Sequence, residues 1–298
     1  MTSKAEKQPL LLVVSGPTAS GKTDFAIQLA QQLNTEILSA DSRQIYREMT
    51  IGTAKPNQQQ LNTVPHHFIN HCSIHDPYNA GIFEREALSL LENLFKKHAT
   101  VIVCGGTGLY IKALCEGLDK LPEANDELRE ELQQLLRLEG VTTLHKLLVQ
   151  LDPEGSKTVD AANPHRLMRA IELVKATGKS LLVLKLNNAT TRPFRIQHIY
   201  MGIDRPELYS RINKRVDTMM EQGFEVEAKD LFPYKHLKAL QTVGYNELFD
   251  YLEGKYSLDE AVNLIKQHTR NYAKRQVTWF KSIDSKIDYR NFKLDEIV

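Results

Sequence analysis

The feature that most constrains this 298-residue chain is a glycine-rich octapeptide near its N-terminus, set between a predicted strand and a predicted helix. It fits the pattern G-x-x-x-x-G-K-[ST], in which the glycines let backbone N–H groups turn around phosphate oxygens. Lys22 adds a positive charge, and the Thr23 hydroxyl can ligate Mg²⁺. We therefore predict a loop, here called the phosphate loop, that binds a diphosphate with Gly16, Pro17, Thr18, Ala19, Ser20, Gly21, Lys22 and Thr23.

The first third of the sequence alternates between strand-like and helix-like segments. Residues 8–15, 36–40 and 100–104 read as buried strands, and residues 22–32 and 83–97 read as helices. Such an alternation favours a parallel sheet covered by helices. The predicted fold class is α/β, with a P-loop-type parallel sheet flanked by helices.

The middle of the sequence has a different character. From about Leu118 to Leu186 the apolar residues recur at helical spacing, and no convincing strand interrupts them. A strand-like run, residues 195–203, then precedes further helices to about Ser282. The length suits two domains, which we predict to be a catalytic core of residues 1–117 and 191–298 and an all-helical insertion domain of residues 118–190.

The third predicted strand lacks a residue that most NTPases with a phosphate loop carry. In those proteins an acid at the end of an apolar strand supports the Mg²⁺. Here the strand of residues 100–104 runs into Gly105-Gly106-Thr107-Gly108, without a carboxylate. A motor or switch NTPase is therefore not favoured, and another diphosphate ligand is.

Asp41 follows the second predicted strand, and Thr107 follows the third. Because the carboxyl ends of parallel strands meet at one edge of a sheet, both should lie near the phosphates. Spacing alone leaves two roles open for Asp41. It either caps a turn before Ser42 and Arg43, or acts as a general base or hydrogen-bond acceptor that orients a nucleophile.

The charge balance restricts any nucleic-acid contact to a local surface. The 38 basic and 37 acidic residues give a net charge of +1. Residues 261–283, however, contain no acid, and Lys266, Arg270 and Lys274 share one helix face. This basic face suits a phosphodiester backbone. The alternative is a solvated amphipathic helix whose aromatic residues belong to the core.

The remaining signals are weaker. The histidines and cysteine of residues 66–75 match no familiar zinc framework, and Phe68 and Ile69 suggest a short strand beside them. The apolar run Leu10–Val14 is too short for a signal peptide or a membrane span. Three unpaired cysteines favour a reduced compartment. A cytoplasmic protein with no membrane association is expected.

Over residues 11–281 the sequence resembles the tRNA dimethylallyltransferase family, also called tRNA isopentenyl transferases. The phosphate loop alone is unspecific, but further motifs in the right order make the resemblance specific. These are residues 39–46 (SADSRQIY), 52–56 (GTAKP), 65–68 (PHHF), 105–110 (GGTGLY), 166–172 (RLMRAIE), 243–245 (VGY) and 274–279 (KRQVTW).

The resemblance implies transfer of a dimethylallyl group from dimethylallyl diphosphate to N6 of the adenosine 3′ of the anticodon. The phosphate loop would bind the prenyl diphosphate, and Asp41 would accept the proton of N6. Lys22, Thr107, Arg215 and a Mg²⁺ ion held by Thr23 would stabilise the departing diphosphate. No obligate protein partner is implied, and a monomer is expected.

The resemblance further implies that the helical insertion grips the anticodon stem-loop of tRNA. Two positions depart from the family pattern: Asn246 stands where many relatives carry Arg or Lys, and His165 where Gln or another polar residue is common. The implied tRNA contacts are Asp41, Ser42, Arg43, Gln44, Thr107, Arg129, His165, Arg166, Leu167, Met168, Arg169, Gln241, Thr242, Val243, Gly244, Tyr245, Asn246, Lys274, Arg275, Gln276, Val277, Thr278, Trp279, Phe280 and Lys281.

Two other functions remain open at this point. A small-molecule or nucleoside kinase would use the same phosphate loop, with Asp41 as base for an acceptor hydroxyl. It would leave the basic helix face without a purpose. A non-enzymatic RNA-binding module would use that face and leave the phosphate loop idle.

Overall fold

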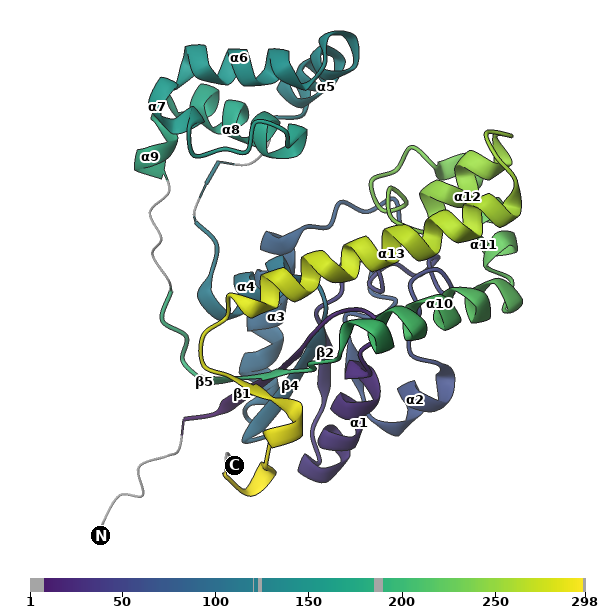
Figure 1. Ribbon diagram of the computed structural model, residues 1–298. Coiled ribbons are helices and arrows are strands. Elements are labelled where there is room, and N and C mark those ends of the chain that lie inside the picture. The colour runs from purple at the N-terminus through teal and green to yellow at the C-terminus, as the bar shows by residue number, and fades with distance from the viewer. Residues whose placement is uncertain (1–7, 120, 123–124, 185–189, 297–298) are drawn as a thin grey trace. The chain divides into compact units, whose positions relative to one another are not determined.

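The computed structural model describes residues 8–119, 121–122, 125–184 and 190–296 (Figure 1). The chain divides into two compact units, one made of residues 1–117 and 191–298 and the other of residues 118–190. These bounds coincide with the predicted ones. The tRNA contact assigned to the smaller unit stays a prediction.

The larger unit is built on a six-stranded parallel sheet, which confirms the predicted fold class. All six residues of the central strand β1 are buried, as expected for a strand covered on both faces. The strand order is β3-β2-β4-β1-β5-β6. The strands are β1 Leu10–Ser15, β2 Ile37–Ser39, β3 His66–His67, β4 Thr100–Gly105, β5 Arg195–Tyr200 and β6 Lys286–Asp288.

Both edge strands differ from the sequence-based expectation. The strand expected at Phe68 and Ile69 lies instead on His66–His67, because Phe68 takes a left-handed backbone with φ of 61° and leaves the sheet. Strand β6 follows the last helix and was not predicted. Its three half-buried residues give too short a pattern to read.

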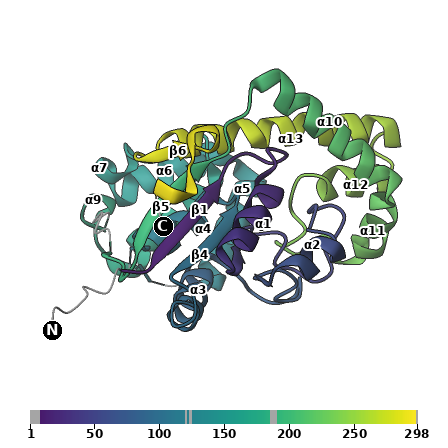
Figure 2. The same ribbon diagram turned by 90° about the horizontal axis from the view of Figure 1, so that it is seen from below.

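Helices cover the sheet and extend beyond it (Figures 1 and 2). Leu10, Leu12 and Val14 of β1 pack in one core cluster with the apolar face of α1. Further along the chain, α10 and α13 lie side by side around Leu208, Ile212 and Ala273. The helices of this unit are α1 Lys22–Leu33, α2 Gln58–Thr63, α3 Ala80–Leu94, α4 Gly108–Glu116, α10 Arg205–Glu221, α11 Phe224–Leu231, α12 Tyr245–Leu252 and α13 Leu258–Lys281.

The smaller unit has its own hydrophobic core, formed among others by Leu144, Leu148, Leu167 and Ile171. Its described residues form helices without a strand, as the spacing of its leucines predicts. The helices are α5 Asp126–Glu139, α6 Val141–Leu151, α7 Pro153–Ser156, α8 Pro164–Thr177 and α9 Leu181–Leu184. Within the described residues of the whole chain, no helix is long and apolar enough to cross a membrane.

Arg192 lies where the chain returns to the larger unit, and it binds α3 and α4 there. Its guanidinium donates to the carbonyls of Ala113 and Leu114 at the end of α4, at 2.6 and 2.9 Å, and pairs with Glu84 of α3 at 2.6 Å. These carbonyls lie at the C-terminus of a helix, where a positive charge is favourable. Arg192 therefore holds the departing and returning segments together beside β5.

Glu36, which directly precedes β2, links this strand to β3 and to the segment before β4. It bonds His67 at 2.6 Å and His98 at 3.3 Å. Burial raises the pKa of Glu36, but the two histidine contacts outweigh burial and hold this pKa below its ordinary value of 4.5.

This arrangement predicts a loss of stability in acid. A carboxyl whose pKa is depressed by folding contributes stability above its unfolded pKa and loses it as the pH falls through the folded value. We expect the free energy of unfolding of the wild-type protein to fall more steeply below pH 4.5 than that of Glu36→Gln. Urea denaturation at several pH values measures this, and parallel curves for both proteins would contradict it.

Candidate functional site

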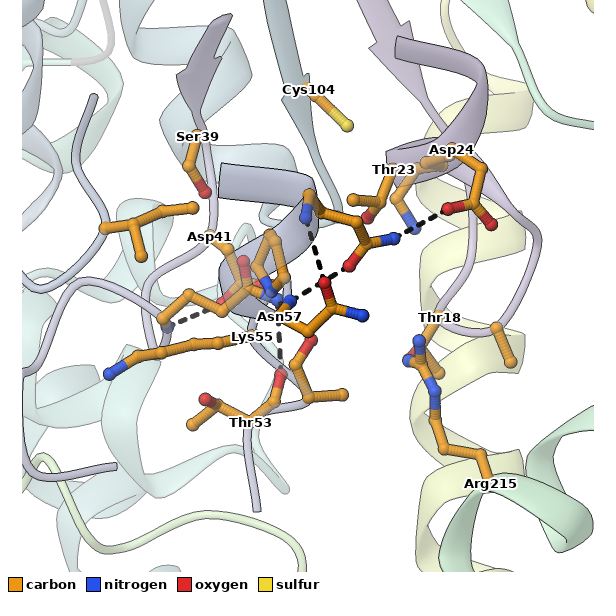
Figure 3. Close-up of a pocket in the computed structure, with 18 of the residues that line it drawn as sticks. Thr18, Thr23, Asp24, Ser39, Asp41, Thr53, Lys55, Asn57, Cys104 and Arg215 are labelled. Carbon is orange, nitrogen blue, oxygen red and sulfur yellow. Dashed lines mark hydrogen bonds between the residues drawn. The ribbon is translucent and has the colours of Figure 1, made fainter. Parts of the chain in front are cut away.

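The carboxyl ends of β1, β4 and β2 lie next to one another in the sheet. The phosphate loop follows β1, Gly106 and Thr107 follow β4, and Asp41 follows β2. A cavity of about 750 Å³ opens at this edge, lined by the phosphate loop from Thr18 onward, Asp41 and Gly106 (Figure 3). The structure thus brings together the segments that strand topology predicted to meet.

The phosphate loop is shaped to receive an anion. Gly21 caps the N-terminus of α1 with a φ of 90°, a backbone conformation that residues other than glycine rarely adopt. Gly21, Lys22 and Thr23 line the cavity, so the N-terminus of α1, with its free N–H groups, adjoins it. The Ser20 hydroxyl oxygen is buried and has no hydrogen-bond partner among the described residues, so a phosphate oxygen would satisfy it.

Two helices distant in sequence hold the phosphate loop from outside. Arg215 of α10 donates to the Thr18 hydroxyl at 3.0 Å, and the two lie side by side in Figure 3. The buried Gln276 of α13 accepts from the Thr18 N–H at 2.8 Å and donates to the Gly106 carbonyl at 2.9 Å. Gln276 therefore ties the loop after β1 to the loop after β4.

Asp41 fills one of the two roles that the sequence left open, that of a turn cap, and the other role stays a prediction. Its Oδ1 accepts from the N–H groups of Arg43 and Gln44 at 2.9 and 3.2 Å, so it does cap a turn. Both bonds fall on Oδ1, so Oδ2 takes no part in the turn. Because Asp41 also lines the cavity, its carboxylate is oriented toward a ligand by its own turn.

Thr107 lies against the same turn. Its hydroxyl accepts from the Ser42 N–H at 3.0 Å, and its own N–H donates to the Ala40 carbonyl at 3.2 Å. Arg43 points away from this contact, toward the carbonyls of Lys238 and Ala239 at 3.1 and 3.0 Å. The structure therefore places Asp41 and Thr107 together and commits Arg43 to a neighbouring loop.

The cavity also contains residues that motif reading did not place in the site. Thr53 and Lys55 line it opposite Thr18 in the view of Figure 3, and Lys214 lines it from α10. Burial lowers the pKa of Lys55 to about 8. The segment of residues 52–56 was recognised only as a family motif, and its position beside the phosphate loop depends on contacts distant in sequence.

The basic face of α13 packs along α10 instead of facing solvent throughout. Lys266 pairs with Asp217 at 2.5 Å, and Arg270 donates to the Asn213 side chain at 2.7 Å. Lys274 lies 5.9 Å from the centre of a tyrosine ring of α10, that of Tyr209. Part of the predicted RNA-binding face is therefore committed to packing between helices.

The opposite flank of α13 borders the cavity. Tyr272 lines the cavity, and desolvation of its phenol there raises the pKa of Tyr272 to about 12. Arg275 lies 5.8 Å from the Tyr272 ring centre. Trp279, Thr278 and Lys281 are exposed, Val277 is half-buried, and Phe280 is fully buried. Lys274 thus lies on the flank of α13 that faces α10, and Arg275 lies on the flank that borders the cavity.

The predicted tRNA contacts of residues 241–246 divide into two groups. Gln241 and Asn246 are exposed, and Thr242 and Val243 are half-buried. Gly244 and Tyr245 are buried, and the Tyr245 hydroxyl donates to Glu227 at 2.6 Å. The Tyr245 side chain is consequently committed to the protein interior and is not available for a tRNA contact.

Within the smaller unit the predicted tRNA contacts also divide. His165 and Arg166 are exposed on α8, whereas Leu167 and Met168 lie in the core of the unit, which leaves only their backbone for an RNA. The arginines Arg129 and Arg169 flank the buried Glu172. Arg129 donates to both oxygens of Glu172 at 2.9 and 3.0 Å, and Arg169 donates to one of them at 3.2 Å.

Comparison with known proteins decides the family. The family model described as IPP transferase matches residues 44–283, more than half of the chain. The chain belongs to the IPP transferase family. Its curated relatives include the tRNA dimethylallyltransferases of Cytophaga hutchinsonii, 49% identical over 91% of this chain and 89% of the relative, and of Christiangramia forsetii, 47% identical over 96% and 94%.

Solved structures of IPP transferase relatives have the same fold. The tRNA isopentenylpyrophosphate transferase from Bacillus halodurans has a TM-score of 0.68 and 34% identity, covering 97% of this chain and 93% of that one. A eukaryotic dimethylallyltransferase acting on tRNA has a TM-score of 0.75 and 28% identity, covering 91% and 70%. The resemblance read from the motifs is thereby confirmed.

The site of this IPP transferase suits Mg²⁺ bound together with a diphosphate. Mg²⁺ prefers oxygen ligands, keeps several waters, and is usually bound by one or two side chains plus substrate phosphates. The Thr23 hydroxyl supplies such an oxygen to the cavity. Within the described residues no group of three or more His, Cys, Asp or Glu side chains could hold a metal by itself.

Lys22 is the buried positive charge of the site. Its Nζ donates to the Pro17 carbonyl at 2.6 Å. Burial lowers the pKa of Lys22 to about 8; nearby Arg215 lowers it further, while Asp41 opposes the shift. An incoming diphosphate would therefore bind best to the protonated form of the lysine.

A pH dependence of ligand affinity follows from Lys22. The protonated fraction of a group with a pKa of about 8 falls with rising pH, so affinity for a prenyl diphosphate should fall about tenfold between pH 7 and pH 9. Calorimetric titration measures this. Lys22→Arg stays charged and should remove the dependence, and an unchanged dependence in Lys22→Arg would exclude Lys22 as its source.

Proposed function

We propose that this IPP transferase transfers a dimethylallyl group from dimethylallyl diphosphate to N6 of the adenosine 3′ of the tRNA anticodon, releasing diphosphate. The observation that carries the proposal is that one cavity combines a phosphate loop with the carboxylate of Asp41. Relatives of similar length that share 47–49% of the sequence carry the name tRNA dimethylallyltransferase, which supports the choice of substrates.

The proposed reaction is a displacement at the first carbon of the prenyl group. The N6 lone pair forms the new C–N bond, the C–O bond breaks, and its electron pair leaves with the diphosphate. Asp41 takes the proton that N6 loses, which restores the neutral amine. Because the adenine lone pair is delocalised into the ring, orientation of N6 by a fixed carboxylate matters as much as basicity.

The phosphate loop acts on the leaving group. Lys22 and Arg215 place positive charge beside the diphosphate, where negative charge grows as the bond breaks. A Mg²⁺ ion held through Thr23 would supply further Lewis-acid stabilisation of that charge. Thr107 supports the Asp41 turn through Ser42 and so helps to keep the base in place.

The adenine must leave the anticodon-loop stack to reach the cavity, because N6 cannot otherwise approach a bound electrophile. Arg275, Tyr272 and Trp279 lie on the α13 flank that borders the cavity, and they suit a phosphate contact and stacking on a base. His165 and Arg166 are the exposed members of the predicted contact in the smaller unit.

The kinase alternative has less support. Membership of the IPP transferase family favours prenyl transfer, and no carboxylate follows β4 in the sequence Gly106-Thr107-Gly108. The test is incubation of the protein and Mg²⁺ with labelled dimethylallyl diphosphate and unmodified tRNA. We expect label in the tRNA. Transfer of the ATP γ-phosphate to a small acceptor, without label in tRNA, would overturn the proposal.

The turn around Asp41 allows its two roles to be separated. In Asp41→Asn the amide oxygen can still accept from Arg43 and Gln44, but it cannot take a proton at neutral pH. We expect turnover to fall by about 100-fold or more, with tRNA affinity nearly unchanged. Single-turnover kinetics and filter binding measure the two. Wild-type turnover in Asp41→Asn would show that Asp41 does not take the proton of N6.

The two basic residues near the end of α13 should weaken tRNA binding through their charge. Lys274→Gln together with Arg275→Gln should reduce the slope of log affinity against log salt by about two units. Diphosphate binding should be unchanged. Lys229→Gln, which removes one positive charge at an exposed position of α11, is the control for each single variant. The two single variants report which flank of α13 contacts the RNA. An unchanged slope in the double variant and in both single variants would exclude Lys274 and Arg275 from the tRNA contact.

A further inference from the structure

The carboxylate of Glu227 on α11 binds three consecutive backbone N–H groups. Oε2 accepts from Thr50 and Ile51 at 3.0 and 2.8 Å, and Oε1 accepts from Gly52 at 2.9 Å. The Tyr245 hydroxyl also donates to Oε1 at 2.6 Å. Four donors on one carboxylate form a fixed anchor, because bonds to an ionised group are stronger than those between neutral groups.

Close packing reinforces this anchor. A side chain at Gly52 would place its Cβ 2.2 Å from the Phe224 ring and 2.7 Å from the Tyr245 ring. Phe224 and Tyr245 are themselves fully buried and meet edge to face at 5.1 Å between ring centres. The backbone of residues 50–52 therefore lies directly on two buried aromatic rings.

The anchored segment continues into a wall of the cavity. Thr50, Ile51 and residues 53–57 all line the cavity, whereas Glu227 and Tyr245 do not line it. Lys55 holds the far side of this wall by donating to the Tyr46 carbonyl and to the Asn70 side chain. Glu227 consequently acts on the cavity only through the segment that it binds.

The wall is linked to Asp41 by a single side chain. The Gln44 amide donates to the carbonyls of Thr53 and Ala54, both at 3.2 Å. The backbone N–H of Gln44 donates to Asp41 Oδ1 at 3.2 Å. A chain of hydrogen bonds therefore runs from α11 through the wall to the carboxylate that is the proposed base.

We propose that Glu227 and Tyr245 are positioning residues that hold the cavity wall of residues 53–57 in place for the prenyl diphosphate. Without Glu227, the wall would depend on Gln44, which bonds Thr53 and Ala54, and on Lys55. The kinetic test of this inference depends on the proposed function, whereas the hydrogen-exchange test depends on the geometry alone. It gives the buried Tyr245 a role inside the protein in place of the predicted tRNA contact.

The first test uses Glu227→Gln, which has the same shape but presents an N–H₂ group where an oxygen accepted. The control is Glu225→Gln on the same helix, where Glu225 accepts from the Tyr251 hydroxyl at 3.2 Å instead of from the wall. We expect KM for dimethylallyl diphosphate to rise about tenfold in Glu227→Gln. KM for tRNA should stay within about twofold, and Glu225→Gln should match the wild type.

The kinetic pattern separates positioning from loss of fold. A smaller folded fraction would lower kcat and leave both KM values unchanged, whereas a displaced wall raises KM for one substrate. Tyr245→Phe removes one donor and keeps the packing, so it should raise the same KM by a smaller factor. Because both variants affect one contact, their effects should not add in the double variant.

The second test does not need catalysis. Hydrogen exchange of the amides of residues 50–52 should be faster in Glu227→Gln than in the wild type and in Glu225→Gln. Unchanged exchange, or an unchanged KM for dimethylallyl diphosphate in an active Glu227→Gln protein, would overturn the positioning role. If exchange is faster in Glu227→Gln but the wild-type protein transfers no label to tRNA, only the proposed function is overturned.

Discussion

The site depends on the parallel pairing of β2, β4 and β1, which brings three loops to one edge of the sheet. Each loop contributes a different group: the phosphate loop after β1, Gly106 and Thr107 after β4, and Asp41 after β2. Parallel strands expose their carboxyl ends in the same direction, so this convergence needs no other cause. Binding of the leaving group and removal of the proton are thereby placed beside one another.

The helices that follow β5 turn this edge into an enclosed site. Arg215 and Gln276 reach the phosphate loop from α10 and α13, and Glu227 reaches the opposite wall from α11. Burial of Lys22 in this enclosure lowers its pKa to about 8. A buried positive charge of this kind is costly without a ligand and favourable with a diphosphate.

Elements whose sequence pattern is local were predicted best. The phosphate loop, the central strands and the helices between Asp126 and Leu184 follow from spacing over a few residues. The edge strands β3 and β6 were predicted worst, because they are only two and three residues long. Sequence reasoning also assigned Tyr245 to tRNA, because a family motif does not say whether a residue acts through its side chain or supports the fold.

The sequence by itself determined the family, the fold class and the residues of the phosphate loop, since each is written in contiguous motifs. Only the tertiary structure decided that Arg215 and Gln276 meet Thr18, and that Glu227 binds residues 50–52. These partners lie more than 170 positions apart. It also decided which flank of α13 borders the cavity, because the rotation of a helix about its axis is set by the residues it packs against.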